Sequence, residues 1–395
     1  VNIAYGATKL AFGKDYIIPK PFDPRLITTV PMAVARAAME SGVAAAPIED
    51  WDKYQEELHT RTGSDKKLVR LITSQAKSDL QRVVFAEGDE LDVLKAAQLV
   101  HEEGIAIPIL LGDEQYIREM MATIEFEGDV TIIDPKKETV KESRDAYAHT
   151  YWQLRQRKGI TLYDAQRRMR ERNYYAAMMV REGDADAMIS GYSRSYPNVL
   201  KPVLQVIDTQ EGVNRVATTN LMITNRGPLF ISDTSININP NAKDLAKIAQ
   251  MTSYTAALFG IQPKVAMLSY SNFGSSKNED AQKVSEAVKL AHRFLPDIAV
   301  DGPIQADFAL NKTMLTNKFP FSKIAGAAVN TLVLPDLNAA NIAYKLIKEL
   351  DDALSIGPIM MGLKHPAHIL QLGASVDEIV HMTAVAAVDA QNKKK

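Results

Sequence analysis

The stretch Val83-Val84-Phe85-Ala86-Glu87-Gly88-Asp89 decides the fold class of this chain. Its apolar first half is typical of a buried strand, and the glycine and charged residues that follow indicate a turn. Helical spacing continues through Leu94, Ala97 and Val100. A second apolar strand is expected over residues 106–110. A strand, a helix and a second strand in this order predict a parallel sheet with right-handed crossovers and helices on both faces.

A different pattern begins at about residue 214. Apolar runs over 216–223 and 229–232 flank a short polar turn, which predicts an antiparallel hairpin and the start of a second lobe. Strands and helices then alternate again, with helices expected over 242–258 and 376–390 and strands at Val265 and over 331–334. The last helix is expected to return to the first lobe.

The first 62 residues have another character. Residues 16–24 contain three prolines and predict an extended arm, because each proline also restricts the residue before it. Two short helices are expected over 31–41 and 51–60, the first of them ended by Gly42. The polar residues 63–67 are predicted to form a linker.

Composition narrows the function classes. The chain has 395 residues, a net charge of −2 and no cysteine, which excludes disulfides, thiolate metal sites and a cysteine nucleophile. Nucleic acid and membrane partners are not expected, because the charge is balanced and no apolar run approaches the ~20 residues of a membrane span. The expected location is the cytoplasm. Because the chain begins at Val1 rather than methionine, we expect it to be part of a longer protein.

The run Ser269-Tyr270-Ser271-Asn272-Phe273-Gly274-Ser275-Ser276-Lys277 lies between the strand at Val265 and a helical pattern from Asn278. A hydroxyl-rich, glycine-bearing turn at a helix N-terminus favours an anion, and a phosphate-bearing ligand is the first hypothesis. The alternative is an ordinary strand-to-helix connection with good capping residues.

Three other clusters allow a functional and a purely structural interpretation. The basic residues between 155 and 172 could bind nucleic acid, but a solvated helix face is favoured. His365 and His368 could hold a metal, yet Pro366 breaks helical geometry between them, and no metal site is predicted. Asp233 and Asn237 lie just before the helix at 242 and form either a capped helix entry or one side of a cleft.

Six runs of residues occur in the order seen in phosphotransacetylases, and several ordered motifs together are specific. They are residues 183–191, 201–205, 233–240, 265–275, 301–305 and 357–359. The chain resembles that family over about residues 66–392. The resemblance implies an α/β fold of two lobes, similar to isocitrate and isopropylmalate dehydrogenases, with a parallel sheet in lobe one and a mixed sheet in lobe two.

Residues 12–26 resemble the end of the catalytic region of bacterial NADP-dependent malic enzymes. The two resemblances together imply the layout of hybrid malic enzymes. The expected domains are the malic tail at 1–62, the linker at 63–67, lobe one at 68–208 plus 365–395, and lobe two at 209–364. The sites for NADP and a divalent metal, Mg²⁺ or Mn²⁺, would lie upstream of Val1.

An active phosphotransacetylase moves an acetyl group between phosphate and the thiol of coenzyme A. A carboxylate base should take the thiol proton, because a thiol of pKa about 8.5 is mostly protonated at neutral pH. Arginines should hold the phosphate and stabilise charge at the reacting carbonyl.

Several of these positions differ from the family pattern. Gln371 and Leu372 replace a serine-arginine pair, and Glu349 replaces a second arginine. Glu378 stands where the family has an aspartate base. Losing one electrostatic donor typically costs about 100- to 1,000-fold in rate. We therefore expect transferase activity to be lost or severely reduced.

The resemblance also implies residues that still bind a ligand. They are Arg194, which replaces a family histidine, Lys201, which replaces an arginine, and Asn237, Ser271, Asn272, Gly274, Ser275 and Gln305. The cleft is therefore expected to bind acetyl-CoA or another acyl-CoA without turning it over.

The leading hypothesis is a regulatory, acyl-CoA-binding and oligomerising domain of an NADP-dependent malic enzyme. Its expected partners are the upstream malic enzyme domain and further copies of itself, in at least a dimer. The alternative is an active phosphate acetyltransferase with Glu378 as base.

Overall fold

The computed structural model describes residues 26–44, 46–51, 53–54, 58, 65–224, 226–351 and 353–394. The chain divides into two compact units, Val1–Arg70 and Leu71–Lys395. The arm expected over 16–24 lies outside the described residues, as does most of the helix expected over 51–60. Within the described ranges, no helix is long and apolar enough to cross a membrane.

The first unit contains helix α1, Leu26–Glu40, with Pro31 inside it. The expected start at Pro31 is wrong, because the helix tolerates a proline that removes one backbone donor. The expected end is confirmed: the Ser41 hydroxyl donates to the Ala37 carbonyl at 2.8 Å, and Gly42 adopts a left-handed φ of +74°. Helix α3 spans Asp65–Ser78, so residues 65–67 of the expected linker are helical.

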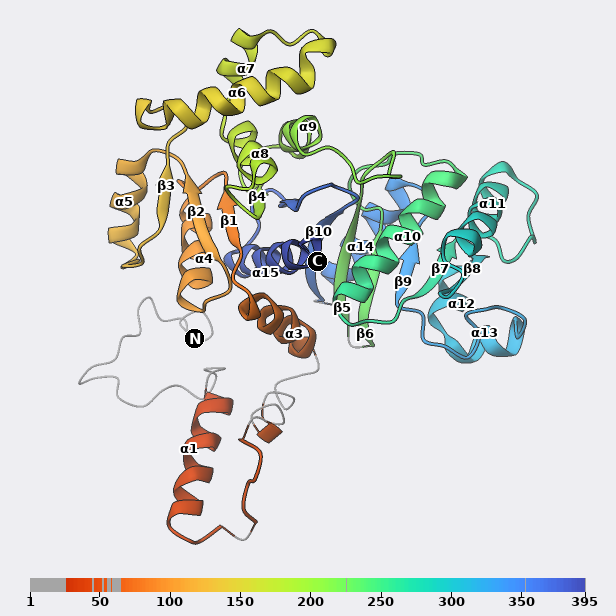
Figure 1. The fold of residues 1–395 in the computed structure, drawn as a ribbon. Helices are drawn as coiled ribbons and strands as arrows, with labels where there is room; N and C mark the ends of the chain where they lie inside the picture. Colours follow the sequence, from red (N-terminus) through yellow and green to blue (C-terminus); the bar gives the residue numbers. More distant parts are fainter. Residues whose placement is uncertain are drawn as a thin grey trace. The chain divides into compact units, whose positions relative to one another are not determined.

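The second unit is built on two sheets, drawn side by side in Figure 1. The first sheet has five strands in the order β11-β4-β1-β2-β3. Their bounds are Arg82–Phe85 for β1, Ile107–Leu111 for β2, Thr131–Ile133 for β3, Ala187–Ser190 for β4 and Ala367–Ile369 for β11. All neighbouring strands are parallel, as predicted. The chain adds β2 and β3 on one side of β1 and β4 on the other, so the strand order reverses between β1 and β4.

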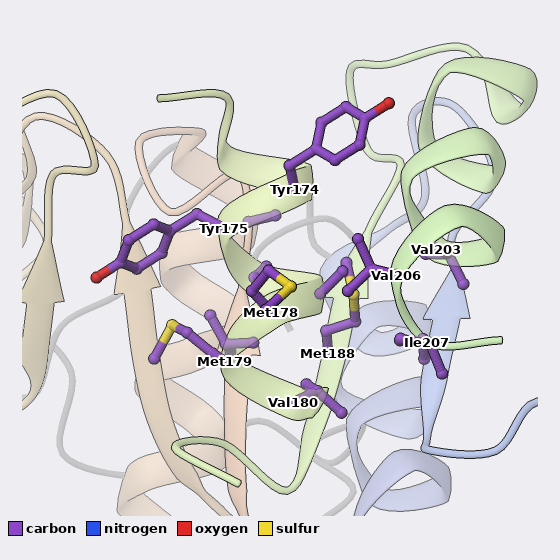
Figure 2. Close-up of a cluster of buried hydrophobic side chains, with 14 of the residues drawn as sticks. Tyr174, Tyr175, Met178, Met179, Val180, Met188, Val203, Val206 and Ile207 are labelled. Carbon is purple, nitrogen blue, oxygen red and sulfur yellow. The ribbon is translucent and has the colours of Figure 1, made fainter. Parts of the chain in front are cut away.

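Helices connect and cover the first sheet. They are α4 (Leu91–Glu102), α5 (Glu114–Thr123), α6 (Lys141–Arg155), α7 (Leu162–Arg168), α8 (Arg172–Glu182) and α9 (Tyr196–Val206), with short 3-10 turns at Glu138–Val140 and Gln156–Lys158. Figure 2 shows Met178 of α8, Met188 of β4 and Val206 of α9 together in the core. This packing holds α8 against β4 and α9.

The second sheet has six strands in the order β10-β5-β6-β9-β7-β8. Their bounds are Ala217–Thr224 for β5, Gly227–Ser232 for β6, Lys264–Leu268 for β7, Ala299–Ile304 for β8, Thr331–Val333 for β9 and Leu354–Met361 for β10. Strands β5 and β6 form the predicted antiparallel hairpin, whereas β6, β9, β7 and β8 run parallel. The sheet is therefore mixed, which confirms the predicted fold class.

Helices α10 (Ala242–Leu258), α11 (Glu279–Phe294), α12 (Ala306–Leu310), α13 (Lys312–Lys318) and α14 (Leu337–Leu350) belong to this second lobe. The last helix, α15 (Val376–Lys393), packs on α4 and β4 of the first lobe and also contacts β10 of the second. Its return to the first lobe is as predicted (Figure 1). The domain limits at 208, 209, 364 and 365 stay predictions.

Candidate functional site

The carboxylate of Glu87 organises the edge of the first sheet where the strand order reverses. Glu87 follows β1, is 5% exposed, and accepts hydrogen bonds from the backbone N–H groups of Gly191, Tyr192 and Ser193 at 2.7, 2.7 and 3.1 Å. The Ser193 hydroxyl donates to the same carboxylate at 2.9 Å. These bonds hold the loop after β4 in one conformation, with Gly191 at a φ of +107°.

A pocket of about 670 Å³ opens at this edge. In open α/β sheets, ligands bind at the carboxyl ends of the strands where the strand order reverses, and this pocket lies at such a point. Seven basic and four acidic side chains line it. The basic ones are Lys136, Arg167, Arg168, Arg170, Arg172, Arg194 and Lys201. The pocket therefore favours an anion with several charges.

Two of these arginines hold the pocket together. Arg172 forms a bidentate ion pair with Asp89, which follows β1. Arg168 donates to the Gln205 side-chain carbonyl at 3.0 Å and to the Tyr174 hydroxyl at 3.2 Å. The favoured sequence interpretation, a solvated helix face, is wrong for both residues. The chain turns between α7 and α8, and that turn directs the two arginines inward.

Four other cations are available to a ligand. Lys136, Arg167, Arg194 and Lys201 are exposed, and none of them forms a salt bridge with a carboxylate in the described part of the chain. Arg194 extends from the loop that Glu87 holds, and Lys201 from the following helix. The structure thus brings together two of the predicted ligand-binding residues, Arg194 and Lys201.

The other predicted ligand residues lie in lobe two. The Asn272 amide donates to the Gln305 side chain at 2.6 Å, and the Gln305 backbone N–H donates back at 2.9 Å. The Ser275 hydroxyl accepts from the Asn272 N–H at 3.1 Å. Ser271 is buried, and Gly274 has a left-handed φ of +87°. These polar groups hold the loop to the end of β8, and their part in ligand binding stays a prediction.

Asn237 and His368 have structural partners. The Asn237 amide donates to Asp233 at 2.6 Å and to the Val216 carbonyl at 2.9 Å, which fixes the entry to α10. His368 is 1% exposed and accepts from the Met360 N–H at 3.2 Å, while its Nε2 lies 3.5 Å from Asp389. Among the described residues, no group of His, Cys, Asp and Glu could hold a metal ion.

Glu378, which stands at the position of the family base, is engaged in contacts within the protein. Glu378 caps α15 by accepting from the Ser375 N–H at 2.9 Å, and it forms an ion pair with Lys348 of α14 at 2.9 Å. Burial raises the pKa of Glu378, but the hydrogen bonds from Lys348 and Ser375 outweigh it and hold the pKa below its usual range. A base with a depressed pKa accepts a proton poorly.

The other replaced positions carry no cationic side chain. Leu372 is 65% exposed and has no polar atom to offer a phosphate. The Gln371 amide donates to the buried Tyr344 hydroxyl at 2.6 Å. Glu349 is exposed near the end of α14.

Glu87, Asp89 and Lys136 were not among the predicted site residues. The sequence does contain a signal for Glu87 and Asp89. Both follow the first predicted strand, and ligands bind at the carboxyl ends of parallel strands. Lys136 carried no comparable signal, since the third strand was not predicted.

The fold and the cationic pocket define a member of a known class. The chain matches the family model "Phosphate acetyl/butaryl transferase" over residues 67–387, and it belongs to that family. A phosphotransacetylase structure from Streptococcus pyogenes is similar with a TM-score of 0.77 and 35% identity, over 84% of this chain and 100% of that one. The EutD phosphotransacetylase from Staphylococcus aureus gives 0.76 and 31%.

Malic enzymes are similar to this chain over almost all of its length. An NADP-dependent malic enzyme of Haemophilus influenzae is 40% identical over 100% of this chain and 52% of its own length. An NAD-dependent malic enzyme of Rhizobium meliloti is 37% identical over 98% of this chain and 51% of its own length. A phosphate acetyltransferase of Thermoanaerobacterium thermosaccharolyticum is 39% identical over 82% of this chain and 99% of its own length. The chain thus spans about half the length of the malic enzymes that it matches.

Proposed function

We propose that this chain binds acyl-CoA in the cationic pocket and serves as the regulatory, oligomerising region of an NADP-dependent malic enzyme. Its upstream region would convert malate to pyruvate and CO₂ with NADP as oxidant. The observation that carries the proposal is the pocket at the ends of β1 and β4, where Arg194 and Lys201 lie beside five further basic side chains. Coenzyme A carries a pyrophosphate and a 3′-phosphate, and arginine and lysine bind such groups well.

The size and position of the pocket support this ligand. Ligand pockets usually enclose about 300–1,000 Å³, and the pocket of about 670 Å³ lies within that range.

The chain's relatives include both NADP- and NAD-dependent malic enzymes. Choice between the two nicotinamide cofactors is therefore expected to reside outside this chain, and NADP stays a proposal.

Calorimetric titration with acetyl-CoA tests the binding step. Unaltered protein should bind acetyl-CoA, and binding should weaken with added salt and with dephospho-CoA as ligand. Lys201→Ala should weaken it by about tenfold, the effect of ~1.4 kcal/mol. The matched control is Lys289→Ala, at an exposed lysine of α11 outside the pocket. Equal affinity of the Lys201 variant and the control would contradict the assignment of the pocket.

The regulatory step requires the full-length enzyme. Acetyl-CoA should change the rate of malate oxidation, and deleting the region that corresponds to residues 66–395 should remove this sensitivity. An effector acts only through different affinities for two enzyme states. Sensitivity that survives the deletion would overturn the regulatory role.

Similarity to phosphate acetyltransferases supports a second function, transfer of an acetyl group from acetyl-CoA to phosphate with Glu378 as base. This alternative predicts phosphate-dependent breakdown of acetyl-CoA that is abolished by Glu378→Gln. A pure preparation that binds acetyl-CoA without turnover would reject it. We favour loss of the reaction because Lys348 neutralises the carboxylate and Leu372 replaces the family arginine.

Oligomerisation is expected through lobe two. Ile342, Leu346 and Leu350 lie four residues apart along α14 and are 58%, 54% and 83% exposed. Contiguous apolar stripes of this kind mark protein interfaces. We therefore assign α14 as the contact with a second copy of the chain.

A further inference from the structure

Two hydrogen bonds join helix α14 of lobe two to residues 371–378 of lobe one, which connect β11 to α15 and form the first turn of α15. The Gln371 amide donates to the Tyr344 hydroxyl at 2.6 Å, and the Lys348 ammonium donates to Glu378 at 2.9 Å. Tyr344 and Lys348 are four residues apart, so they share one face of α14. We name these two bonds the α14 latch.

The lobe-two side of the latch is firmly held. Tyr344 is 2% exposed and belongs to the core cluster of lobe two, so its hydroxyl has little freedom to move relative to that lobe. On the other side, Glu378 is held by the N-cap of α15. The latch therefore connects a rigid part of one lobe to the start of a rigid helix on the other.

The lobe-one side of the latch touches the loop after β4. The Leu370 N–H donates to the Ser190 carbonyl at 2.7 Å, and the Gly373 N–H donates to the Tyr192 carbonyl at 3.1 Å. These two bonds flank Gln371 in the sequence. The same loop continues into Arg194, which lines the cationic pocket. A path of hydrogen bonds and short backbone segments thus runs from α14 to the loop that carries Arg194.

Close packing makes this path stiff. A Cβ atom at Gly191 would come within 2.9 Å of the Leu370 carbonyl oxygen, so the two segments are already as close as backbones allow. A displacement of residues 370–373 must therefore displace the loop after β4 as well. Packed elements of this kind transmit small shifts instead of absorbing them.

We propose that Tyr344, Gln371, Lys348 and Glu378 are positioning residues that set the loop carrying Arg194, and so the affinity of the cationic pocket. None of the four lines the pocket. The ligand in this inference rests on the proposed function, whereas the mechanical connection from α14 to the loop does not. By linkage, a ligand that moves Arg194 must change the strength of the latch by the same free energy.

The test compares latch variants with a matched control in the 395-residue chain. Tyr344→Phe removes one hydroxyl and keeps the buried ring, and Lys348→Met keeps the length of the side chain without its charge. The control is Lys289→Met, at an exposed lysine of α11. The measurements are acetyl-CoA affinity by calorimetry and hydrogen exchange of the peptide covering residues 188–196 without ligand.

Each latch variant should weaken acetyl-CoA binding by about three- to tenfold, the value of one hydrogen bond of ~1 kcal/mol. The double variant Tyr344→Phe and Gln371→Met should bind acetyl-CoA no more weakly than either single variant does, because each substitution removes the same hydrogen bond. Amides of Gly191, Tyr192 and Ser193 should exchange faster in the latch variants than in the control.

The two proposals fail in different ways. If acetyl-CoA does not bind the unaltered chain, the proposed function is overturned, while the exchange rates still decide the positioning role. If exchange over 188–196 matches the control in both latch variants, the positioning role is overturned whatever the ligand. Unchanged affinity in latch variants of a chain that binds acetyl-CoA overturns it equally.

Discussion

The carboxylate of Glu87 accepts two hydrogen bonds from Ser193, one from its backbone N–H at 3.1 Å and one from its hydroxyl at 2.9 Å. Both residues follow strands of the first sheet, and their contact fixes the loop that presents Arg194 to the pocket. The negative charge of Glu87 therefore interacts with donors of the protein itself and does not repel a ligand.

Replacing Glu87 by glutamine should damage both stability and binding. The amide group can accept at only one of its two heavy atoms, so at least one of the three loop N–H groups that donate to Glu87 loses its partner. An unsatisfied buried donor costs about 1–3 kcal/mol, and the free energy of unfolding should fall by that amount in denaturant titrations. Glu286→Gln, at an exposed position of α11, is the control and should change stability by less than about 0.5 kcal/mol.

Replacing Lys201 by arginine should strengthen acetyl-CoA binding. The guanidinium group can bind a phosphate with two parallel hydrogen bonds, whereas the ammonium group acts as a single point of charge. We expect a gain of about two- to tenfold in calorimetric affinity, from ~0.5–1.4 kcal/mol. A loss of affinity relative to unaltered protein would show that the lysine is not directed at a phosphate.

Introducing one family residue should not by itself produce acetyl transfer. Leu372→Arg places a cation at a position that is 65% exposed, so the stability should change by less than about 0.5 kcal/mol. We expect no turnover from either protein, because the ion pair between Lys348 and Glu378 is present in both. The assay is phosphate-dependent release of coenzyme A, and measurable turnover in the single variant would contradict the assigned role of the Lys348 contact.

The ion pair of Glu378 should appear in the acid limb of the stability profile. Because the folded pKa lies below the ordinary value of about 4.3, the stabilisation is complete above that pH. It is lost as pH falls through the lower, folded pKa. The pair is partly exposed, so its contribution should be at most about 1 kcal/mol. Glu378→Gln should therefore unfold more readily at neutral pH, and the difference should shrink below about pH 4.

A charge on the exposed stripe of α14 should disrupt self-association. Leu346→Lys places an ammonium group in the middle of the apolar row formed with Ile342 and Leu350. The expected result is a smaller species in sedimentation velocity, with an unchanged circular dichroism spectrum. Lys289→Ala serves as the surface control. If Leu346→Lys sediments like unaltered protein, α14 is not the contact between copies.

Local patterns were sufficient for much of the fold. The hairpin of β5 and β6 and the full extent of α10 could be predicted because hydrophobic periodicity and capping residues are local signals. Asn241 is the N-cap of α10 and forms a capping box with Asp244. The resemblance to a known family supplied the arrangement of the two lobes, which periodicity cannot determine.

Distant partners explain what could not be predicted. Arg172 is paired with Asp89, which lies 83 residues away in the sequence, so its local pattern indicated only a solvated face. Glu378 is similar, because its partner Lys348 lies 30 residues before it on another lobe. A sequence pattern can show which residue stands at a position, but it does not show which partner has already engaged it.

The N–H groups of the loop after β4 already donate to Glu87, and this affects how ligand recognition at the pocket can change in evolution. Many α/β proteins meet a phosphate with backbone N–H groups, which every amino acid except proline supplies. Here Glu87 already occupies those groups, so ligand charge must be met by side chains. Each of those side chains can be exchanged by a single substitution without disturbing the main chain. Single substitutions can therefore change the ligand preference of this edge one residue at a time, while the main chain stays the same.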